Sequence, residues 1–212
     1  YAVWAAQIKA CMDHSNASAD PARIDYSEIA KERIDRIMKH SPHKVHTVML
    51  GNSITEQGGD WNKRLGRKHI RNSGQGGYTT GQMLWILESC VFADSPGVCF
   101  VMGGINDLTL GIPVHQIFEN HKAIAGQLTG HGITPVLQST LYQHHSPGNN
   151  GHVRMLNQLL KAFCRENTIH YIDLNERMSG ENGLKAEYTT DGTHLTEKGY
   201  EIWSELLKDF IK

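Results

Sequence analysis

Short apolar runs alternate along the chain with longer stretches in which apolar residues recur every three or four positions. Runs of about six apolar or β-branched residues that end at glycine or polar residues are typical of strands, whereas the wider spacing is typical of amphipathic helices. The run at 98–102 is apolar throughout, as expected of a parallel strand buried on both faces. Five such runs predict strands, at residues 45–50, 69–72, 98–102, 133–137 and 169–174.

Helical spacing fills the intervals between these runs. Proline or a hydroxyl side chain precedes several helical stretches, and Thr79 or Thr80 and Thr196 are the expected N-caps. Residues 138–151 are polar and predict a loop. The expected helices cover residues 21–40, 60–67, 80–91, 113–128, 153–163 and 197–210.

Strands that alternate with helices are typical of a parallel sheet covered on both faces. We therefore expect one α/β domain over residues 1–212, a flavodoxin-like three-layer α/β/α sandwich with a five-stranded parallel sheet. Residues 1–44 would form an N-terminal arm and helix before the first strand.

Composition narrows the class of partner. The 212 residues carry a net charge of −1, which gives no electrostatic reason to expect nucleic acid or an anionic membrane surface as a partner. No apolar run approaches the roughly 20 residues that cross a bilayer. The first residue is Tyr1 rather than Met, which indicates a trimmed or processed chain, so the missing signal peptide does not identify the compartment.

Cysteines and histidines give no metal motif. The four cysteines are scattered without a C-x-x-C pair, and the thirteen histidines include no H-E-x-x-H sequence. We expect buried free thiols and no metal site, with one disulfide left open.

Four clusters of glycine and polar residues stand out. Three of them directly follow the first three predicted strands, and the fourth precedes the last helix. Chemistry in open parallel sheets gathers at the carboxyl ends of the strands. Together the clusters supply the nucleophile, base, carboxylate and oxyanion donors that acyl transfer needs. They are Gly51-Asn52-Ser53, Asn72 to Gly77, Gly103 to Asp107 and Asp191 to His194.

In order and spacing these clusters resemble the four motif blocks of the SGNH (GDSL-like) hydrolases. The family's blocks are Gly-Asp-Ser, Asn-x-Gly-x-x-Gly, Gly-x-Asn-Asp and Asp-x-x-His, and the resemblance runs from Val45 to Tyr200. It implies that Ser53 is the nucleophile, His194 the general base and acid, and Asp191 the carboxylate that orients the imidazole.

The resemblance also implies an oxyanion hole. Its donors would be the backbone N–H groups of Ser53 and Gly77 and the side-chain amide of Asn106. Gly77 is chosen over Gly76 because the family's residue directly precedes the position of Tyr78. We expect Asp107 to be structural and to cap the turn after Asn106.

Departures from the family pattern leave every catalytic group in place. Asn52 replaces the usual Asp of the first block, and Tyr78 stands where Asp is common. We expect Asn52, Tyr78, Trp61 and Tyr142 to line the substrate pocket.

The resemblance implies a serine esterase without a cofactor that removes a small acyl group, above all acetyl, from an oxygen of a larger molecule such as a carbohydrate. Platelet-activating-factor acetylhydrolase-like proteins and carbohydrate acetylesterases are members of this kind. By this analogy and the trimmed start, a secreted or periplasmic location is favoured over a cytoplasmic one. The oligomeric state is left open.

Three alternatives remain. The same site residues would suit a lysophospholipase or thioesterase. A non-catalytic binding domain with this fold predicts a broken block, and no block is broken. A flavin or nucleotide binder would need a phosphate-cradling loop after the first strand, but residues 51–55 match neither G-x-G-x-x-G nor a P-loop.

Overall fold

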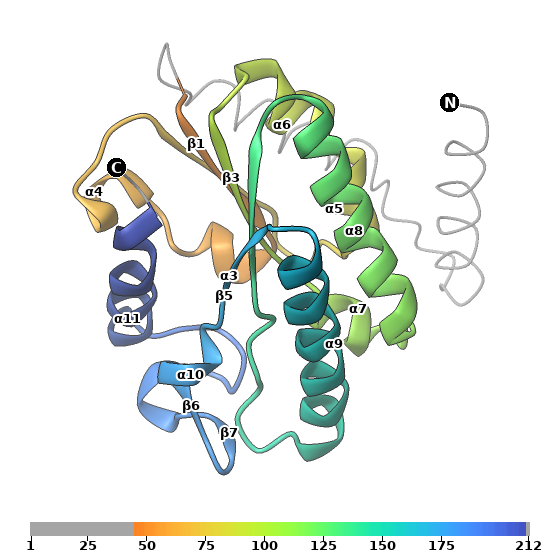
Figure 1. Ribbon diagram of the computed structural model, residues 1–212. Helices are drawn as coiled ribbons and strands as arrows, with labels where there is room; N and C mark the ends of the chain where they lie inside the picture. Colours follow the sequence, from red (N-terminus) through yellow and green to blue (C-terminus); the bar gives the residue numbers. More distant parts are fainter. Residues whose placement is uncertain (1–44, 211–212) are drawn as a thin grey trace, which may run out of the picture.

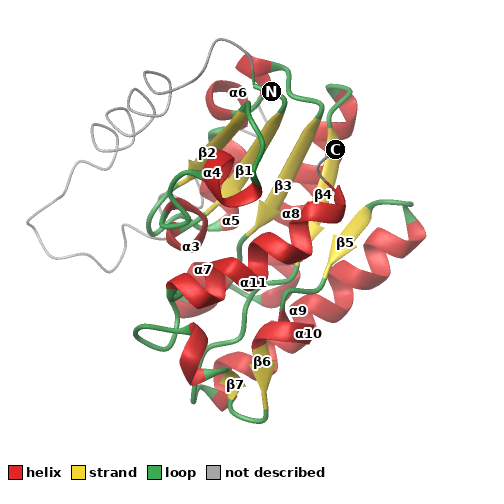
Figure 2. Cartoon of the chain, turned by 90° about the vertical axis from the view of Figure 1, so that its left-hand side faces the viewer, coloured by secondary structure: helices red, strands yellow, loops and turns green. Residues whose placement is uncertain are grey.

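The computed structural model describes residues 45–210, so the arm and helix predicted over 1–44 lie outside the described residues. Five parallel strands form one sheet in the order β2-β1-β3-β4-β5 (Figures 1 and 2), which confirms the predicted five-stranded parallel α/β fold. The strands are β1 (Thr47–Gly51), β2 (Ile70–Gly74), β3 (Val98–Met102), β4 (Thr134–Gln138) and β5 (His170–Ile172).

Helices cover both faces of this sheet. In Figures 1 and 2 the helices α5, α8 and α9 lie on one face, and α4 and α11 lie on the other. Their bounds are α4 (Trp61–Leu65), α5 (Thr80–Trp85), α8 (Val114–Gly130), α9 (Pro147–Glu166) and α11 (Glu197–Leu207). Thr79 and Thr196 cap α5 and α11 through their side chains, as predicted.

The chain departs from the predicted helices in two places. The helix expected over 80–91 is broken at Ile86 into α5 and α6 (Leu87–Cys90), and α9 begins six residues before the expected position. The first turn of α9 is Pro147-Gly148-Asn149-Asn150, which has no apolar residue at helical spacing and therefore gave no helical signal.

Several short elements were not predicted. Helices α3 (Ser53–Glu56) and α7 (Ile105–Thr109) begin directly after β1 and shortly after β3, and a small hairpin pairs β6 with β7. The other unpredicted elements are β6 (Ser179–Gly180), β7 (Gly183–Leu184), α10 (Asn175–Met178), η1 (Phe92–Asp94) and η2 (Ala186–Tyr188), while η3 (Lys208–Phe210) continues the last helix to its predicted end. Each is shorter than the windows in which periodicity can be recognised.

Trp61 belongs to the core rather than to a pocket. It is 1% exposed, its ring packs edge-on against Trp203 at 4.9 Å between centroids, and its indole N–H donates to the Thr55 carbonyl at 3.1 Å. The expectation that Trp61 lines the substrate pocket is corrected accordingly, because its side chain fastens α4 to α11.

The expectations about cysteines, metal ligands and membrane-spanning helices can be compared with the structure over the described residues only. Cys90, Cys99 and Cys164 are buried free thiols there, while Cys11 lies outside it. No cluster of potential metal ligands occurs within residues 45–210. Among the helices of that range, none has the length and apolar character needed to span a membrane.

Candidate active site

Ser53 is the first residue of α3, at the carboxyl end of β1. The side chain of Asn52 caps this short helix by accepting a hydrogen bond from the Ile54 N–H at 3.0 Å. Gly74, at the end of β2, allows α3 to lie directly on the sheet, since a Cβ there would be 2.2 Å from the Glu56 nitrogen. Ser53 is thereby held half-buried at the carboxyl end of the parallel strands.

A chain of short contacts joins Ser53 to the loop before α11. The Ser53 Oγ lies 2.9 Å from His194 Nε2, and His194 Nδ1 lies 2.7 Å from Asp191 Oδ2. These residues are 141 positions apart at the serine–histidine contact, so the fold brings the first and last sequence clusters together.

The Asp191 carboxylate has a second task within its own turn. Its Oδ1 accepts hydrogen bonds from the backbone N–H groups of Thr193 at 2.9 Å and His194 at 2.8 Å. The His194 side-chain bond, together with these N–H donors, lowers the pKa of Asp191 to about 2. An ionised carboxylate can only accept, so His194 Nδ1 carries the proton and Nε2 is left to accept from the serine hydroxyl.

The turn that carries Asp191 and His194 is held from outside by the segment after β4. Gln143 Nε2 donates to Thr193 Oγ1 at 2.8 Å, and the His144 N–H donates to the Gly192 carbonyl at 2.8 Å. Gly192 has φ +94, a conformation that favours glycine. Sequence reasoning missed Gln143, because a polar residue in a polar stretch gives no signal of its partner.

The expected oxyanion donors lie on neighbouring turns. Among residues 45–210, nothing accepts a hydrogen bond from the backbone N–H of Ser53 or Gly77. Gly77 is exposed with φ +79, and a side chain there would meet nothing within 4 Å. The Asn106 amide donates to the Tyr78 carbonyl at 2.9 Å, which places it beside the turn of Gly77.

Asp107 does not cap its own turn as expected. It is fully buried, and its two carboxylate oxygens each lie 3.0 Å from the Thr80 nitrogen. The Thr80 hydroxyl also donates to it and in turn accepts from Asn120 at 2.9 Å. Burial raises the pKa of the Asp107 carboxyl, while the Thr80 donors lower it.

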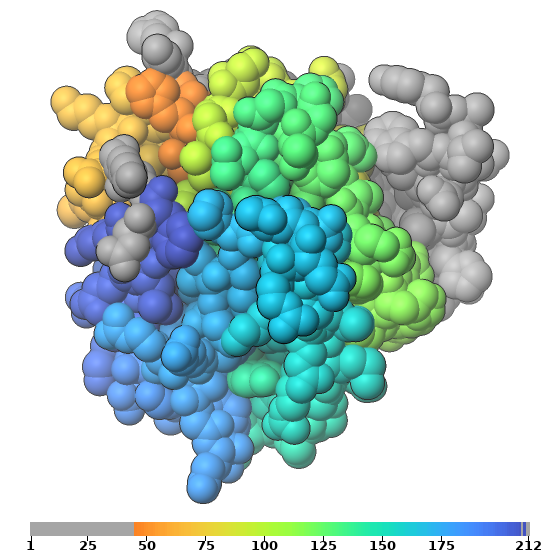
Figure 3. Space-filling view, viewed as in Figure 1, coloured from red at the N-terminus to blue at the C-terminus, as the bar shows by residue number. Residues whose placement is uncertain are grey.

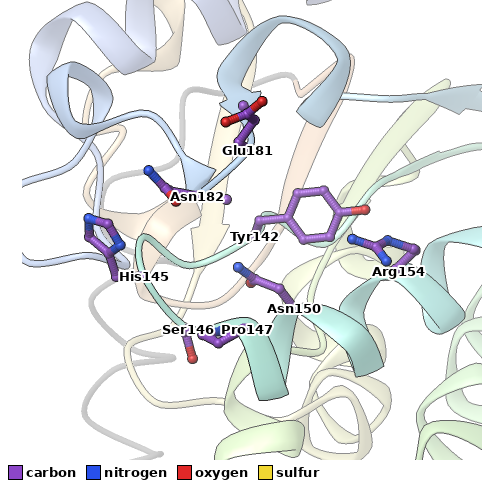
Figure 4. Close-up of a pocket in the computed structure, with 10 residues that line it drawn as sticks. Tyr142, His145, Ser146, Pro147, Asn150, Arg154, Glu181 and Asn182 are labelled. Atoms are coloured by element: carbon purple, nitrogen blue, oxygen red, sulfur yellow. The ribbon is translucent and has the colours of Figure 1, made fainter.

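The remaining pocket candidates differ in their placement. Asn52 is 0% exposed and Tyr78 is 6% exposed, so the expectation that they line the substrate pocket is corrected: the Asn52 side chain is used to cap α3, and Tyr78 packs in the core. Tyr142 is half-buried and lines a hollow of about 410 Å³ between α9 and the β6–β7 hairpin (Figure 4). The segments that form this hollow meet on the face shown in Figure 3. The residues that line the hollow include none of Ser53, Asp191 and His194.

Comparison with known proteins identifies the family and the fold. The model of the GDSL-like lipase/acylhydrolase family matches residues 49–202. A GDSL-like lipase from Bacteroides thetaiotaomicron is 26% identical, with a TM-score of 0.75 over 88% of this chain and 96% of its own. An acetylxylan esterase from Geobacillus stearothermophilus shares the fold at 15% identity, with a TM-score of 0.64 over 80% of this chain and 94% of its own.

Curated relatives carry a different kind of name. Proteins of Streptococcus agalactiae named N-acylneuraminate cytidylyltransferase are 28% and 30% identical over 182 residues, which is 85% of this chain. The chain spans only 41% of the length of these relatives, so their name describes a longer protein.

Proposed function

The chain belongs to the GDSL-like lipase/acylhydrolase family, and from this membership we propose that it is a serine esterase that removes a small acyl group, acetyl above all, from a carbohydrate hydroxyl. The observation that carries the proposal is the contact chain from Ser53 Oγ through His194 to Asp191, at 2.9 and 2.7 Å. Nucleophile, base and orienting carboxylate within hydrogen-bond reach are the signature of an activated serine.

In the proposed reaction the Ser53 Oγ attacks the ester carbonyl carbon while His194 Nε2 takes the hydroxyl proton. The resulting tetrahedral oxyanion collapses, the C–O bond to the alcohol breaks, and His194 returns its proton to the leaving alcohol. Water then attacks the acyl-serine by the same route, which releases the carboxylic acid and restores Ser53. Asp191 stays ionised and stabilises the imidazolium throughout.

The oxyanion would accept hydrogen bonds from the Ser53 and Gly77 N–H groups and from Asn106 Nδ2. The first two have no acceptor in the described part of the chain, and such pre-oriented donors stabilise developing charge without reorganisation. Asn106 donates one of its two amide hydrogens to the Tyr78 carbonyl, and this bond orients the second amide hydrogen.

A carbohydrate is the proposed alcohol because the fold is shared with proteins named acetylxylan esterase, a name that gives an acetylated sugar polymer as their substrate. The mechanism needs no cofactor. Lysophospholipids and thioesters could enter the same chemistry, and a chain-length series separates them from small acyl esters.

The test is hydrolysis of p-nitrophenyl acetate, butyrate and octanoate by the natural chain and by Ser53→Ala. We expect acetate to be the best substrate and the Ser53→Ala rate to fall by about 10³-fold or more. Preference for octanoate would favour a lysophospholipase. Equal slow rates for both proteins would overturn the serine mechanism and favour a non-catalytic domain.

A further inference from the structure

Two hollows adjoin each other beside the catalytic loop. The first, of about 410 Å³, lies between the segment after β4, the start of α9 and the β6–β7 hairpin, and the second, of about 210 Å³, continues along α9. Tyr142 and Arg154 line both, so the two form one groove, which we call the α9 groove. In Figure 4 the Tyr142 ring stands in the middle of the first hollow with its hydroxyl end toward Arg154.

The walls of the α9 groove are fixed by hydrogen bonds. Asn150 on α9 exchanges two bonds with the Gln143 backbone, at 2.8 and 2.7 Å, and the His145 N–H donates to the Asn182 carbonyl at 2.9 Å. Gly183 brings the hairpin against Gln143 so closely that a Cβ would lie 2.1 Å from the Gln143 carbonyl oxygen. The groove is therefore a built feature and not a gap between loose loops.

The lining carries charges of both signs that do not neutralise one another. Arg154 and Lys161 lie on α9, Glu181 lies on the hairpin and Asp173 follows β5. None of these four side chains forms an ion pair with any residue in the range 45–210. Donors and acceptors are thus presented together, and the lining adds the Asn182 amide and the Tyr142 ring.

This balance selects the class of ligand. Two cationic and two anionic side chains balance, so the groove offers no net attraction to an anion or a cation, and an acyl chain would leave the polar groups without partners. A neutral polyhydroxylated molecule satisfies donors and acceptors at once, because each hydroxyl both donates and accepts. Its apolar C–H face would pack on Tyr142.

We propose that the α9 groove binds the neutral oligosaccharide that carries the ester, so that the enzyme acts on a glycan chain rather than on a single sugar. The inference rests on the proposed esterase function. The groove is joined to the catalytic turn by Gln143, which holds Asn150 at one end and Thr193 at the other. Sugar units next to the acylated one would occupy the groove while the ester lies at Ser53.

Two substrates of different length test the proposal. We compare kcat/KM on acetylated xylotetraose and on acetylated methyl xyloside, with p-nitrophenyl acetate as the small reference. The natural chain should prefer the tetrasaccharide. Arg154→Ala should lower kcat/KM on the tetrasaccharide by about tenfold or more, mainly through KM, and leave the other two rates unchanged.

Arg165→Ala is the matched control, because Arg165 is exposed on the same helix and does not line the groove. It should leave all three rates unchanged. Equal loss in the two variants, or no preference for the tetrasaccharide in the natural chain, would overturn the inference.

Binding of unacetylated xylotetraose, measured by calorimetry on the natural chain and on Arg154→Ala, separates this inference from the proposed function. Weaker binding to Arg154→Ala supports the groove even if p-nitrophenyl acetate is not hydrolysed, in which case the esterase proposal alone fails. Hydrolysis of p-nitrophenyl acetate with equal tetraose binding to both proteins overturns the groove alone. Tighter binding of a uronic acid oligomer than of xylotetraose overturns the assignment of a neutral ligand.

Discussion

The carboxylate of Asp107 accepts hydrogen bonds from both the backbone N–H and the hydroxyl of Thr80, 27 residues earlier in the chain. This contact ties the turn that carries Gly77 to the helix that carries Asn106. The two turns supply different donors to the proposed oxyanion hole, so their relative position depends on a buried carboxylate that itself contacts no substrate.

Replacement of Asp107 by Asn should therefore affect both stability and rate. The Asn side chain has one acceptor oxygen where the carboxylate has two, so either its NH₂ group faces the Thr80 N–H or the two Thr80 donors share a single oxygen. The free energy of unfolding should therefore fall by about 1–3 kcal/mol. We expect kcat on p-nitrophenyl acetate to fall by about tenfold or more because Gly77 and Asn106 lose their alignment. Urea denaturation and steady-state kinetics measure the two effects.

Asp94→Asn is the control for this change. Asp94 is also largely buried, and it pairs with Arg71 at the end of η1 rather than with a catalytic turn. It should lose stability while kcat stays the same. If Asp107→Asn keeps the full kcat despite reduced stability, Asp107 supports the fold and does not position the oxyanion donors.

Asp191→Asn should separate orientation from stability. The amide can still accept from the Thr193 and His194 N–H groups, but it no longer stabilises the imidazolium and can hold the wrong tautomer. We expect kcat to fall by about 10²–10⁴-fold with little change in the urea midpoint. Asp60→Asn is matched to it, since Asp60 also accepts from two backbone N–H groups, those of Asn62 and Lys63, as the N-cap of α4, and the kcat of this variant should not change.

Asn106→Ala tests the side-chain donor of the oxyanion hole. Loss of one such donor costs about 10²–10³-fold in kcat, and KM for p-nitrophenyl acetate should change little because the donor acts in the transition state. Asn62→Ala loses a similar bond from its amide to the Ile70 carbonyl, at 2.9 Å, away from the site. If both variants lose equal activity, Asn106 has no special part in the reaction.

His121 should make the fold sensitive to mild acid. It is fully buried in α8, and burial lowers its pKa from 6.5 to about 4. Between these values the unfolded chain binds the proton and the folded chain does not, so stability should fall as the pH falls from 6.5 toward 4, by up to about 1.4 kcal/mol per pH unit.

Urea denaturation at pH 7 and pH 5 checks this prediction by comparing the natural chain with His121→Gln. Gln does not titrate, so the variant should lose less stability between the two pH values. Other groups that titrate in this range contribute equally to both proteins. An identical loss would show that His121 does not cause the acid sensitivity.

The sequence predicts the five strands well because each is an apolar run bounded by glycine or polar residues. It does not contain their spatial order, in which β1 lies between β2 and β3, because pairing depends on contacts far apart in the chain. The break at Ile86 and the early start of α9 at Pro147 also depend on tertiary packing rather than on local periodicity.

The candidate site shows the same division. Ser53, Asn106 and His194 are candidates from block spacing through the family resemblance, but the distances between them could not be predicted. Trp61 was placed in the pocket because an aromatic near a helix start gives no sign of which way it faces. Gln143 and Arg154 gave no signal, since a polar side chain becomes a candidate site residue only once its neighbours are known.

The segment 142–145 has two faces with different neighbours. On one side Gln143 and His144 hold the turn of Asp191 and His194, and on the other Tyr142 and His145 line the α9 groove. A laboratory library that randomises this segment to change the preferred glycan would therefore also disturb turnover. Variants selected for a new glycan should be slower at first, and their rates should be restored by second substitutions near Gly192 rather than by further changes in the groove.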